Sequence, residues 1–315
     1  MIRPYKITDA IITGTALQLI AAAVTCIYVW GSKKKLPGIM KLVLAVSITG
    51  LLVIIYGTFI EPLIVVTRYE TIDLQDYASE EPFQVILIAD LHVGRFFNSD
   101  KLDTVVQMIN EHKDIEYVLI LGDVVNGTSD HLSDLDVLKD IDDDKEVFFI
   151  YGNHDYYKDG DHQDEIVDGL REKIEGLDIT IIDNDIARLD DKIVLAGIED
   201  LWPKKEDYTM LDQTNADETV ILMAHNPDAV VDIANDSNYK SKVDLIVSGH
   251  THGGEMRLPL IGPLSPLPTS DLPDSYDQGL KYYDDIPVYI TSGLGNIGVR
   301  MRIFNNPEIV ILTIN

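Results

Sequence analysis

The chain has 315 residues, of which 46% are hydrophobic. This apolar content is sufficient for a folded core and excludes a disordered chain, and the single cysteine, Cys26, excludes a small disulfide-stabilised scaffold. The formal net charge is −28, from 53 acidic and 25 basic residues. An acidic chain of this kind is unsuited to binding duplex nucleic acid, because phosphates require a basic face.

The charge is unevenly distributed along the chain. Residues 1–66 contain six basic and two acidic residues, a net charge of +4, which leaves −32 on the other 249 residues. Two uncharged runs, Ala10–Trp30 and Leu42–Ile60, lie in this basic segment. At ~1.5 Å per residue each forms a helix of about 30 Å, the thickness of a bilayer core. The sequence therefore predicts a membrane anchor at residues 1–66, with transmembrane helices at about 10–30 and 42–60.

A basic turn that includes Lys33, Lys34 and Lys35 joins the two predicted helices. Cytoplasmic loops of membrane proteins are enriched in Lys and Arg. We therefore expect a multi-pass protein of the cell membrane with this turn in the cytoplasm and the acidic domain on the extracytoplasmic side. The N-terminal tail also carries Arg3 and Lys6, so the charge difference is small. A pair of buried helices in a soluble protein is the alternative, although such helices rarely lack every charge over about 20 residues.

Residues 83–315 follow an acidic segment, 67–82, which we expect to be a linker. Short runs of Val, Ile and Leu alternate with segments of helical periodicity, a pattern typical of an α/β fold whose strands are buried on both faces. Strands are predicted at 83–89, 117–121, 147–151, 179–182, 193–196, 219–224, 245–248, 288–291 and 309–314, and helices at 101–112, 161–175 and 227–234. The proline-rich residues 258–273 predict a long loop.

Residues that commonly bind metals follow five of the predicted strands. They are Asp90-Leu91-His92, Gly122-Asp123, Gly152-Asn153-His154-Asp155, His225 and Gly249-His250-Thr251-His252. The carboxyl ends of strands form the ligand crevice of an open α/β sheet, and residues i and i+2 of an extended segment face the same side. Imidazole with carboxylate is typical of zinc, iron or manganese sites. Because these are too many ligands for one four-coordinate ion, we expect two divalent ions (Mn, Fe or Zn).

The five blocks resemble those of the calcineurin-like metallophosphoesterase superfamily, from about Phe83 to the C-terminus. The Gly-His-Thr-His-Gly-Gly run and the later Ser292-Gly293-Leu294-Gly295 and Pro307-Glu308-Ile309 are similar to a bacterial membrane-associated group that includes a UDP-2,3-diacylglucosamine hydrolase. Glu255 departs from that group, which often has glutamine there. The resemblance implies a two-sheet β-sandwich flanked by helices in four layers. It also implies a metal-dependent phosphoric ester hydrolase.

The resemblance further implies a role for each matching residue. Asp90, His92 and His252 would hold the first ion, Asn153, His225 and His250 would hold the second, and Asp123 would bridge the two. The ions would lower the pKa of a water, and the resulting hydroxide would attack phosphorus. His154 matches the residue that protonates the leaving oxygen or stabilises its charge. Asp155 either orients His154 or caps the segment that follows.

Two arginines, Arg95 and Arg257, flank the metal-binding blocks. Both are candidates for contact with a substrate phosphate. A surface ion pair is the alternative for each, because the domain offers many carboxylates.

The predicted function is hydrolysis of a phosphodiester, phosphomonoester or pyrophosphate bond in a phosphorylated small molecule or lipid. The membrane tether favours an envelope lipid or a nucleotide-linked precursor. A non-catalytic, metal-stabilised surface binding module is the alternative from another class, although such a module has no need of an acid such as His154. A metal-dependent nuclease or protein phosphatase is the alternative among enzymes. No duplex nucleic acid partner is expected, and the sequence leaves the oligomeric state open.

Overall fold

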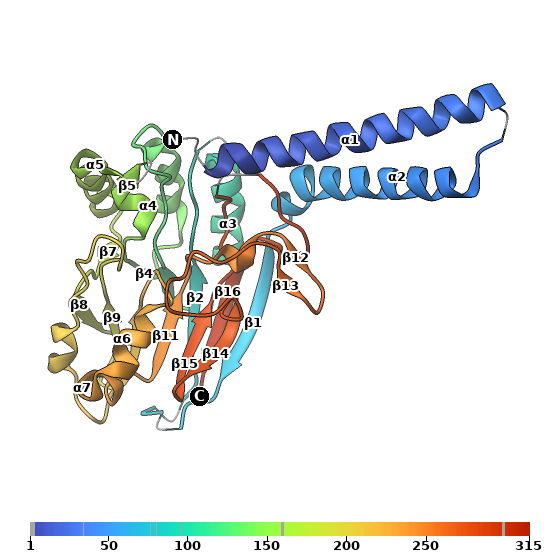
Figure 1. The fold of residues 1–315 in the computed structure, drawn as a ribbon. Helices are drawn as coiled ribbons and strands as arrows, with labels where there is room; N and C mark the ends of the chain where they lie inside the picture. Colours follow the sequence, from blue (N-terminus) through green and yellow to red (C-terminus); the bar gives the residue numbers. More distant parts are fainter. Residues whose placement is uncertain are drawn as a thin grey trace.

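The computed structural model describes residues 4–33, 35–75, 77–79, 81–94, 96–158, 161–297 and 300–315. Two mixed six-stranded sheets pack face to face, helices cover the outer faces, and a helical hairpin projects from one end (Figure 1). The helices are α1 (Pro4–Lys33), α2 (Gly38–Phe59), α3 (Ser99–Glu111), α4 (Asn153–Tyr156), α5 (Asp164–Glu175), α6 (Ala229–Asn235) and α7 (Ser237–Lys240), with 3₁₀ turns η1 (Glu61–Leu63), η2 (Leu132–Asp140), η3 (Thr209–Gln213) and η4 (His252–Gly254).

The first sheet has the strand order β1-β16-β2-β3-β4-β7, and the second has the order β14-β15-β11-β10-β9-β8. The strands of the first sheet are β1 (Val66–Ile72), β16 (Glu308–Ile314), β2 (Phe83–Ile88), β3 (Tyr117–Ile120), β4 (Glu146–Phe149) and β7 (Thr180–Ile181). Those of the second are β14 (Gly279–Tyr283), β15 (Ile286–Ile290), β11 (Leu245–Ser248), β10 (Thr219–Met223), β9 (Ile193–Gly197) and β8 (Asp185–Arg188). Two short ribbons, β5 (Tyr157–Lys158) with β6 (Asp161–His162) and β12 (Arg257–Leu258) with β13 (Gly262–Pro263), lie outside these sheets.

The core between the sheets follows from the alternation of side chains along each strand. Val85 and Leu87 of β2 point inward and meet Ile221 and Met223 of β10, and all four are fully buried. Burying such a side chain stabilises the fold by about 1.5–3 kcal/mol relative to leaving it exposed. The intervening residues of β2 face the helices instead, so both faces of the strand must be apolar.

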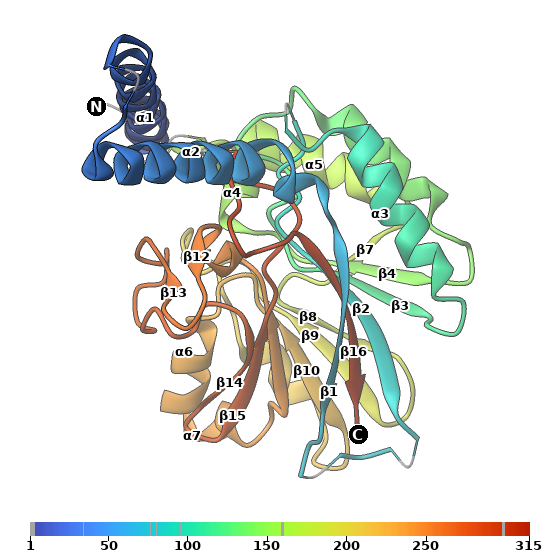
Figure 2. The same ribbon diagram turned by 90° about the vertical axis from the view of Figure 1, so that its right-hand side faces the viewer.

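Helices cover the outer face of each sheet and complete four layers (Figure 2). The apolar stripe of α3, which includes Leu102, Val105 and Ile109, is buried against the first sheet. On the second sheet, Val230 and Ile233 of α6 are buried in a separate cluster. The predicted fold class, a two-sheet sandwich flanked by helices, is confirmed.

The predicted strands and helices overlap observed ones, but three edge strands, β1, β8 and β14, were not predicted. Residues 67–82 were expected to form a linker, whereas β1 occupies Val66–Ile72 and pairs in parallel with β16. Strands β14 and β8 form the two edges of the second sheet, where β14 pairs with β15 and β8 pairs with β9. All three strands carry charged residues, such as Arg68 in β1 and Arg188 in β8, so none has the continuous apolar run of a central strand.

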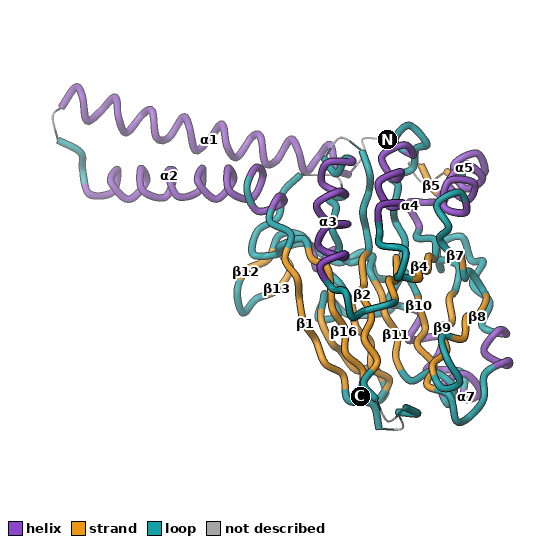
Figure 3. Tube along the Cα trace, turned by 180° about the vertical axis from the view of Figure 1, so that it is seen from behind, coloured by secondary structure: helices purple, strands orange, loops and turns teal. Residues whose placement is uncertain are grey.

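Helices α1 and α2 pack against each other in antiparallel fashion and extend away from the sandwich (Figures 1 and 3). The segments Ala10–Lys33 and Gly38–Leu63 are long and apolar enough to cross a membrane, and only 11% and 6% of their most apolar windows are buried. A core helix of a soluble protein would be mostly buried. This exposure therefore argues against the alternative of two buried soluble helices.

The end of α2 is fastened to the loops of the domain. The backbone N–H of Arg302 donates a hydrogen bond to the carbonyl of Gly57 (2.9 Å), and the carboxylate of Glu61 accepts one from the backbone N–H of Asn305 (2.6 Å). The side-chain amide of Asn305 donates in turn to the carbonyl of His252 (2.6 Å). The helical hairpin is thus linked, through Asn305, to a loop that carries predicted metal ligands.

Candidate metal centre

The predicted ligands lie in the loops that follow strands β2, β3, β4, β10 and β11, so both sheets contribute. Five of these residues have a positive φ although none is glycine: Asp90 (54°), His92 (45°), Asp123 (55°), His250 (70°) and His252 (51°). This backbone conformation costs of order 1–2 kcal/mol per residue and is concentrated at functional sites. The strain indicates that these side chains are held in place for a purpose other than stability.

Glycines allow the loops to approach one another. A Cβ atom on Gly122 would lie 2.6 Å from the backbone nitrogen of Gly152. A Cβ atom on Gly152 would lie 2.4 Å from Oδ1 of Asp123. No side chain fits at either position, which explains why glycine precedes the acidic and amide residues in these two blocks.

The first cluster consists of Asp90, His92 and His252, all buried. Nε2 of His92 lies 3.1 Å from Nε2 of His252, and the latter nitrogen lies 3.5 Å from Oδ1 of Asp90. The candidate ligand atoms lie within 4.8 Å of one another. This arrangement can hold one cation.

The second cluster consists of Asp123, His225 and His250, which are also buried. Nε2 of His225 lies 3.2 Å from Oδ2 of Asp123 and 3.3 Å from Nδ1 of His250. The same Oδ2 lies 3.6 Å from Nε2 of His92, so the Asp123 carboxylate stands between the two clusters. Nδ1 of His225 lies 2.7 Å from the carbonyl oxygen of Leu121, which can only accept, so Nε2 is left free to bind a cation.

The pKa values of the imidazoles suit cation binding. Burial lowers the pKa of His92 and of His250 to about 3, and burial together with the neighbouring His92 lowers that of His252 well below its usual range. Burial also disfavours the charged form of His225, but the Asp123 carboxylate outweighs burial and raises the pKa of His225 well above its usual range. Neutral imidazole is the form that binds a metal, and a cation beside Asp123 would replace the proton on His225.

The two carboxylates differ. Burial alone would raise the pKa of Asp123, but His225 and His154 hold it well below the usual range, so this group is ionised. Burial raises the pKa of Asp90 to about 7, against the opposing attraction of His225. A neighbouring cation would favour the ionised form of Asp90 as well.

The surroundings of the Asn153 side chain indicate whether the site can hold two ions. Its side chain is almost fully buried, and its Oδ1 atom has no hydrogen-bond partner in the part of the chain that the structure describes. A buried carbonyl without a partner is costly, and a hard cation would satisfy it. Asn153 lines the same cavity as Asp123 and His250. The residues present therefore fit two divalent ions.

His154 and Asp155 have different surroundings. The backbone N–H of His154 donates to Oδ1 of Asp123 (2.7 Å), and its ring meets that of His92 edge to face at 5.1 Å. The Asp155 carboxylate accepts hydrogen bonds from the backbone N–H groups of Asp123 (2.8 Å), Gly152 (2.9 Å) and Val125 (3.0 Å). All three donors precede Asp155 in the chain, so the carboxylate holds the Asp123 and Asn153 loops together.

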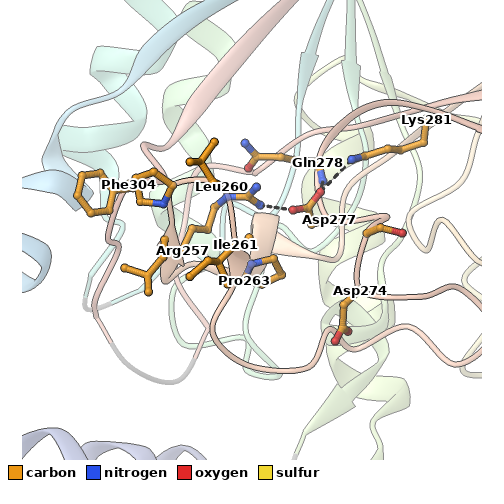
Figure 4. Close-up of a pocket in the computed structure, with 13 residues that line it drawn as sticks. Arg257, Leu260, Ile261, Pro263, Asp274, Asp277, Gln278, Lys281 and Phe304 are labelled. Carbon is orange, nitrogen blue, oxygen red and sulfur yellow. Dashed lines mark hydrogen bonds and ion pairs between the residues drawn. The ribbon is translucent and has the colours of Figure 1, made fainter.

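Of the two flanking arginines, Arg257 lies among the residues that the structure describes. Nη1 of Arg257 lies 2.6 Å from Oδ2 of Asp277 and donates to the carbonyl of Gly253 (2.9 Å). Arg257 thus makes the ion pair that was the structural alternative, at the edge of a cavity of about 830 Å³ (Figure 4). Arg95 lies outside the described residues.

A smaller cavity of about 260 Å³ opens over the predicted ligands, and its wall includes residues that the sequence did not predict to belong to the site, among them Trp202 and Glu255. Trp202, which is 47% exposed, meets the His250 ring edge to face at 5.5 Å. Glu255 has a φ of 47° and lies 3.7 Å from Nδ1 of His252. Glu255 stood out in the sequence only as a departure from the resembled group directly after the His-Gly-Gly run, and an isolated tryptophan after a strand gives no signal. Residues 265–268 close another side of the cavity.

Residues 83–254, which include every predicted metal ligand, match the calcineurin-like phosphoesterase family. The chain belongs to this family, and its phosphoesterase domain is thereby placed among metal-dependent phosphoester hydrolases. The resemblance identified from the five sequence blocks is confirmed.

Three relatives illustrate the match. An uncharacterized metallophosphoesterase of Helicobacter pylori is 29% identical over 74% of this chain and 60% of its own length. The phosphodiesterase YaeI of Escherichia coli is 28% identical over 73% and 82%. A transmembrane protein with metallophosphoesterase domain of Danio rerio is 29% identical over 72% and 52%. The chain thus spans about half to three fifths of the Danio and Helicobacter proteins.

Proposed function

We propose that this chain is a membrane-anchored phosphoesterase with two divalent metal ions, which hydrolyses a phosphodiester, phosphomonoester or pyrophosphate bond. The observation that carries the proposal is the placement of the Asp123 carboxylate between two buried clusters of candidate ligands at the base of one cavity. Asp90, His92 and His252 would hold one ion, and Asn153, His225 and His250 the other. The E. coli relative named as a phosphodiesterase supports cleavage of a diester.

The bound ions would neutralise charge on the phosphate oxygens and lower the pKa of a water. The chain's own residues position the reactants. Asp155 fixes the backbone beside Asp123, and the backbone N–H of His154 fixes one oxygen of that carboxylate. The His154 ring, which lines the cavity, protonates the leaving oxygen or donates a hydrogen bond to it.

The substrate class follows from the tether. Helices α1 and α2 expose apolar surface along their length, and we propose that they span the membrane as an anchor at residues 1–65, followed by the phosphoesterase domain from Val66 to the C-terminus. Such an anchor keeps the cavity near lipid, which favours an envelope lipid or a nucleotide-linked precursor as the substrate. The net charge of −32 outside the anchor disfavours a long polyanion such as nucleic acid.

The full-length chain in detergent should hydrolyse bis-p-nitrophenyl phosphate when Mn²⁺ is supplied. Removal of metal with EDTA should reduce release of p-nitrophenolate to background, and added Mn²⁺ should restore it. The reason is that the neutral imidazoles and the amide oxygen of Asn153 are proposed as ligands of the ions that activate the water. Parallel additions of Fe²⁺ and Zn²⁺ would rank the metals. Hydrolysis that persists after exhaustive chelation would contradict the metal-dependent mechanism.

The orientation proposed for the domain, outside the cytoplasm, can be measured with one cysteine. Tyr282 is 59% exposed on β14, and the natural Cys26 is buried between the helices. In a Cys26→Ser background, Tyr282→Cys should react with a membrane-impermeant maleimide on intact cells. Labelling that appears only after the cells are permeabilised would place the domain in the cytoplasm instead.

A further inference from the structure

A patch of apolar side chains lies uncovered around the β12–β13 ribbon. We define the hairpin patch as Leu258, Leu260, Ile261, Leu264 and Phe304. Leu260 is fully exposed, Ile261 is 72% exposed and Phe304 is 63% exposed. Figure 4 shows Leu260, Ile261 and Phe304 along the rim of the larger cavity. Neighbouring exposed apolar groups of this size mark a surface that something else covers.

The charge pattern of this segment is unlike that of the rest of the domain. The 13 residues from Leu258 to Ser270 contain no charged side chain, although the domain around them is strongly acidic. Arg257, which precedes them, pairs with Asp277, a carboxylate that it shares with Lys281. The tip of the ribbon is therefore both apolar and uncharged, as expected for a surface that meets lipid hydrocarbon.

Backbone contacts tie the hairpin patch to the end of the second helix. The backbone N–H of Arg257 donates to the carbonyl of Ile303 (2.9 Å), and the N–H of Ile303 donates to the carbonyl of Glu255 (3.0 Å). The next residue back, Arg302, is hydrogen-bonded to Gly57 in the last turn of α2. The base of the β12–β13 ribbon is therefore fixed relative to α2, and Figures 1 and 2 show the ribbon beside the domain-proximal end of the helices.

Exposed apolar side chains continue from the helices towards the ribbon. Phe59 and Ile60 at the end of α2, and Leu63 and Ile64 just beyond it, are between 42% and 59% exposed. Phe304 directly follows Arg302 and Ile303, which lie against Gly57 in the last turn of α2, and its other neighbour, Asn305, donates its backbone N–H to Glu61. These contacts place Phe304 of the hairpin patch close to the end of α2.

We infer that the hairpin patch inserts into the surface of the lipid bilayer beside α1 and α2, as a second point of attachment. This inference rests on the proposal that the two helices span a membrane. A lipid surface fits better than a protein partner because the patch continues the exposed apolar surface of α2 and carries no charged side chain to specify a partner.

Insertion would orient the metal centre. Residues 265–268, which directly follow β13 and Leu264, line the smaller cavity together with His154 and His250. A ribbon tip held in the bilayer would therefore keep the mouth of this cavity at the membrane surface. Substrates embedded in the same membrane could then reach the site without leaving the lipid.

The test uses the full-length chain with Cys26→Ser and a single new cysteine, labelled with an environment-sensitive fluorophore and reconstituted in phosphatidylcholine vesicles. The probe at Leu260→Cys should emit at shorter wavelength than the probe at the matched control Tyr282→Cys. Lipids brominated in their acyl chains should quench the probe at position 260 and leave the probe at position 282 unaffected. Tyr282 is a suitable control because it is also a large exposed apolar residue but lies beside the turn between β14 and β15, which contains Asp284 and Asp285.

The other outcomes are distinct. If the chain floats with the vesicles but the probe at position 260 emits at the wavelength expected in water and is not quenched, the inference is overturned and the anchor proposal stands. If the probe at position 260 is shielded without quenching, and the unlabelled Leu260→Cys chain forms a disulfide-linked dimer on oxidation, a second copy covers the patch and the inference is also overturned. If the chain does not float with vesicles at all, the proposed anchor and this inference both fail.

Discussion

Replacing Asp123 with asparagine should lower kcat/KM for bis-p-nitrophenyl phosphate by about 10³-fold or more, because the loss of a charged bridging ligand weakens both ion sites together. Oδ2 of Asp123 faces His92 in one cluster and His225 in the other, at 3.6 and 3.2 Å. The measurement is the initial rate in saturating Mn²⁺, together with metal content by elemental analysis.

The substitution is nearly isosteric, so folding should survive it. The asparagine oxygen can still accept the backbone N–H of His154, which donates to Oδ1 of Asp123 at 2.7 Å. Asp136→Asn is the matched control, because Asp136 is an exposed residue that pairs with Lys173 and takes no part in the site. Asp123→Asn with wild-type activity would refute the site assignment, whereas equal losses in both variants would point to a general effect of the substitution.

The ligand loops could be predicted from the sequence because two local signals coincide there. Each block follows a run of buried β-branched and leucine residues, and the glycines before Asp123 and Asn153 mark positions where no Cβ fits. Parallel strands bring their carboxyl ends to one edge, so residues distant in sequence meet. The convergence of Asp90 with His250, whose backbone nitrogen lies 3.1 Å from the carboxylate, requires in addition that the two sheets pack face to face, because Asp90 follows β2 of the first sheet and His250 follows β11 of the second.

Other features depended on contacts that no local pattern encodes. His154 and Asp155 are adjacent in the sequence, so spacing does not show which groups each side chain contacts. In the structure the Asp155 carboxylate accepts hydrogen bonds from three backbone N–H groups. The pairing of β1 with β16 joins residues near opposite ends of the chain, and the hydrogen bond between Glu61 and Asn305 spans a separation of 244 residues. The long-range contacts that fasten the helical hairpin to the site were therefore not predictable from periodicity or spacing.

Replacing His154 with asparagine should lower kcat by about 10²- to 10⁴-fold for a substrate with a poor leaving group, the range expected for loss of a general acid. The loss should be much smaller for a p-nitrophenyl ester, because p-nitrophenolate departs without being protonated. Comparison of methyl p-nitrophenyl phosphate with methyl phenyl phosphate measures this difference on substrates of similar size.

The environment of His154 makes this comparison informative. Burial lowers the pKa of His154, although Asp123 opposes the shift, and the ring lines the cavity above the predicted ligands. The contact of His154 with Asp123 is made by its backbone N–H and is kept by any substitution, so the effect of losing the ring can be isolated. His112→Asn, at the end of α3, is the matched control and should leave both rates unchanged. Equal losses for both esters would show that His154 does not act at the leaving oxygen, because protonating that oxygen and stabilising its charge both matter more when the leaving group is more basic.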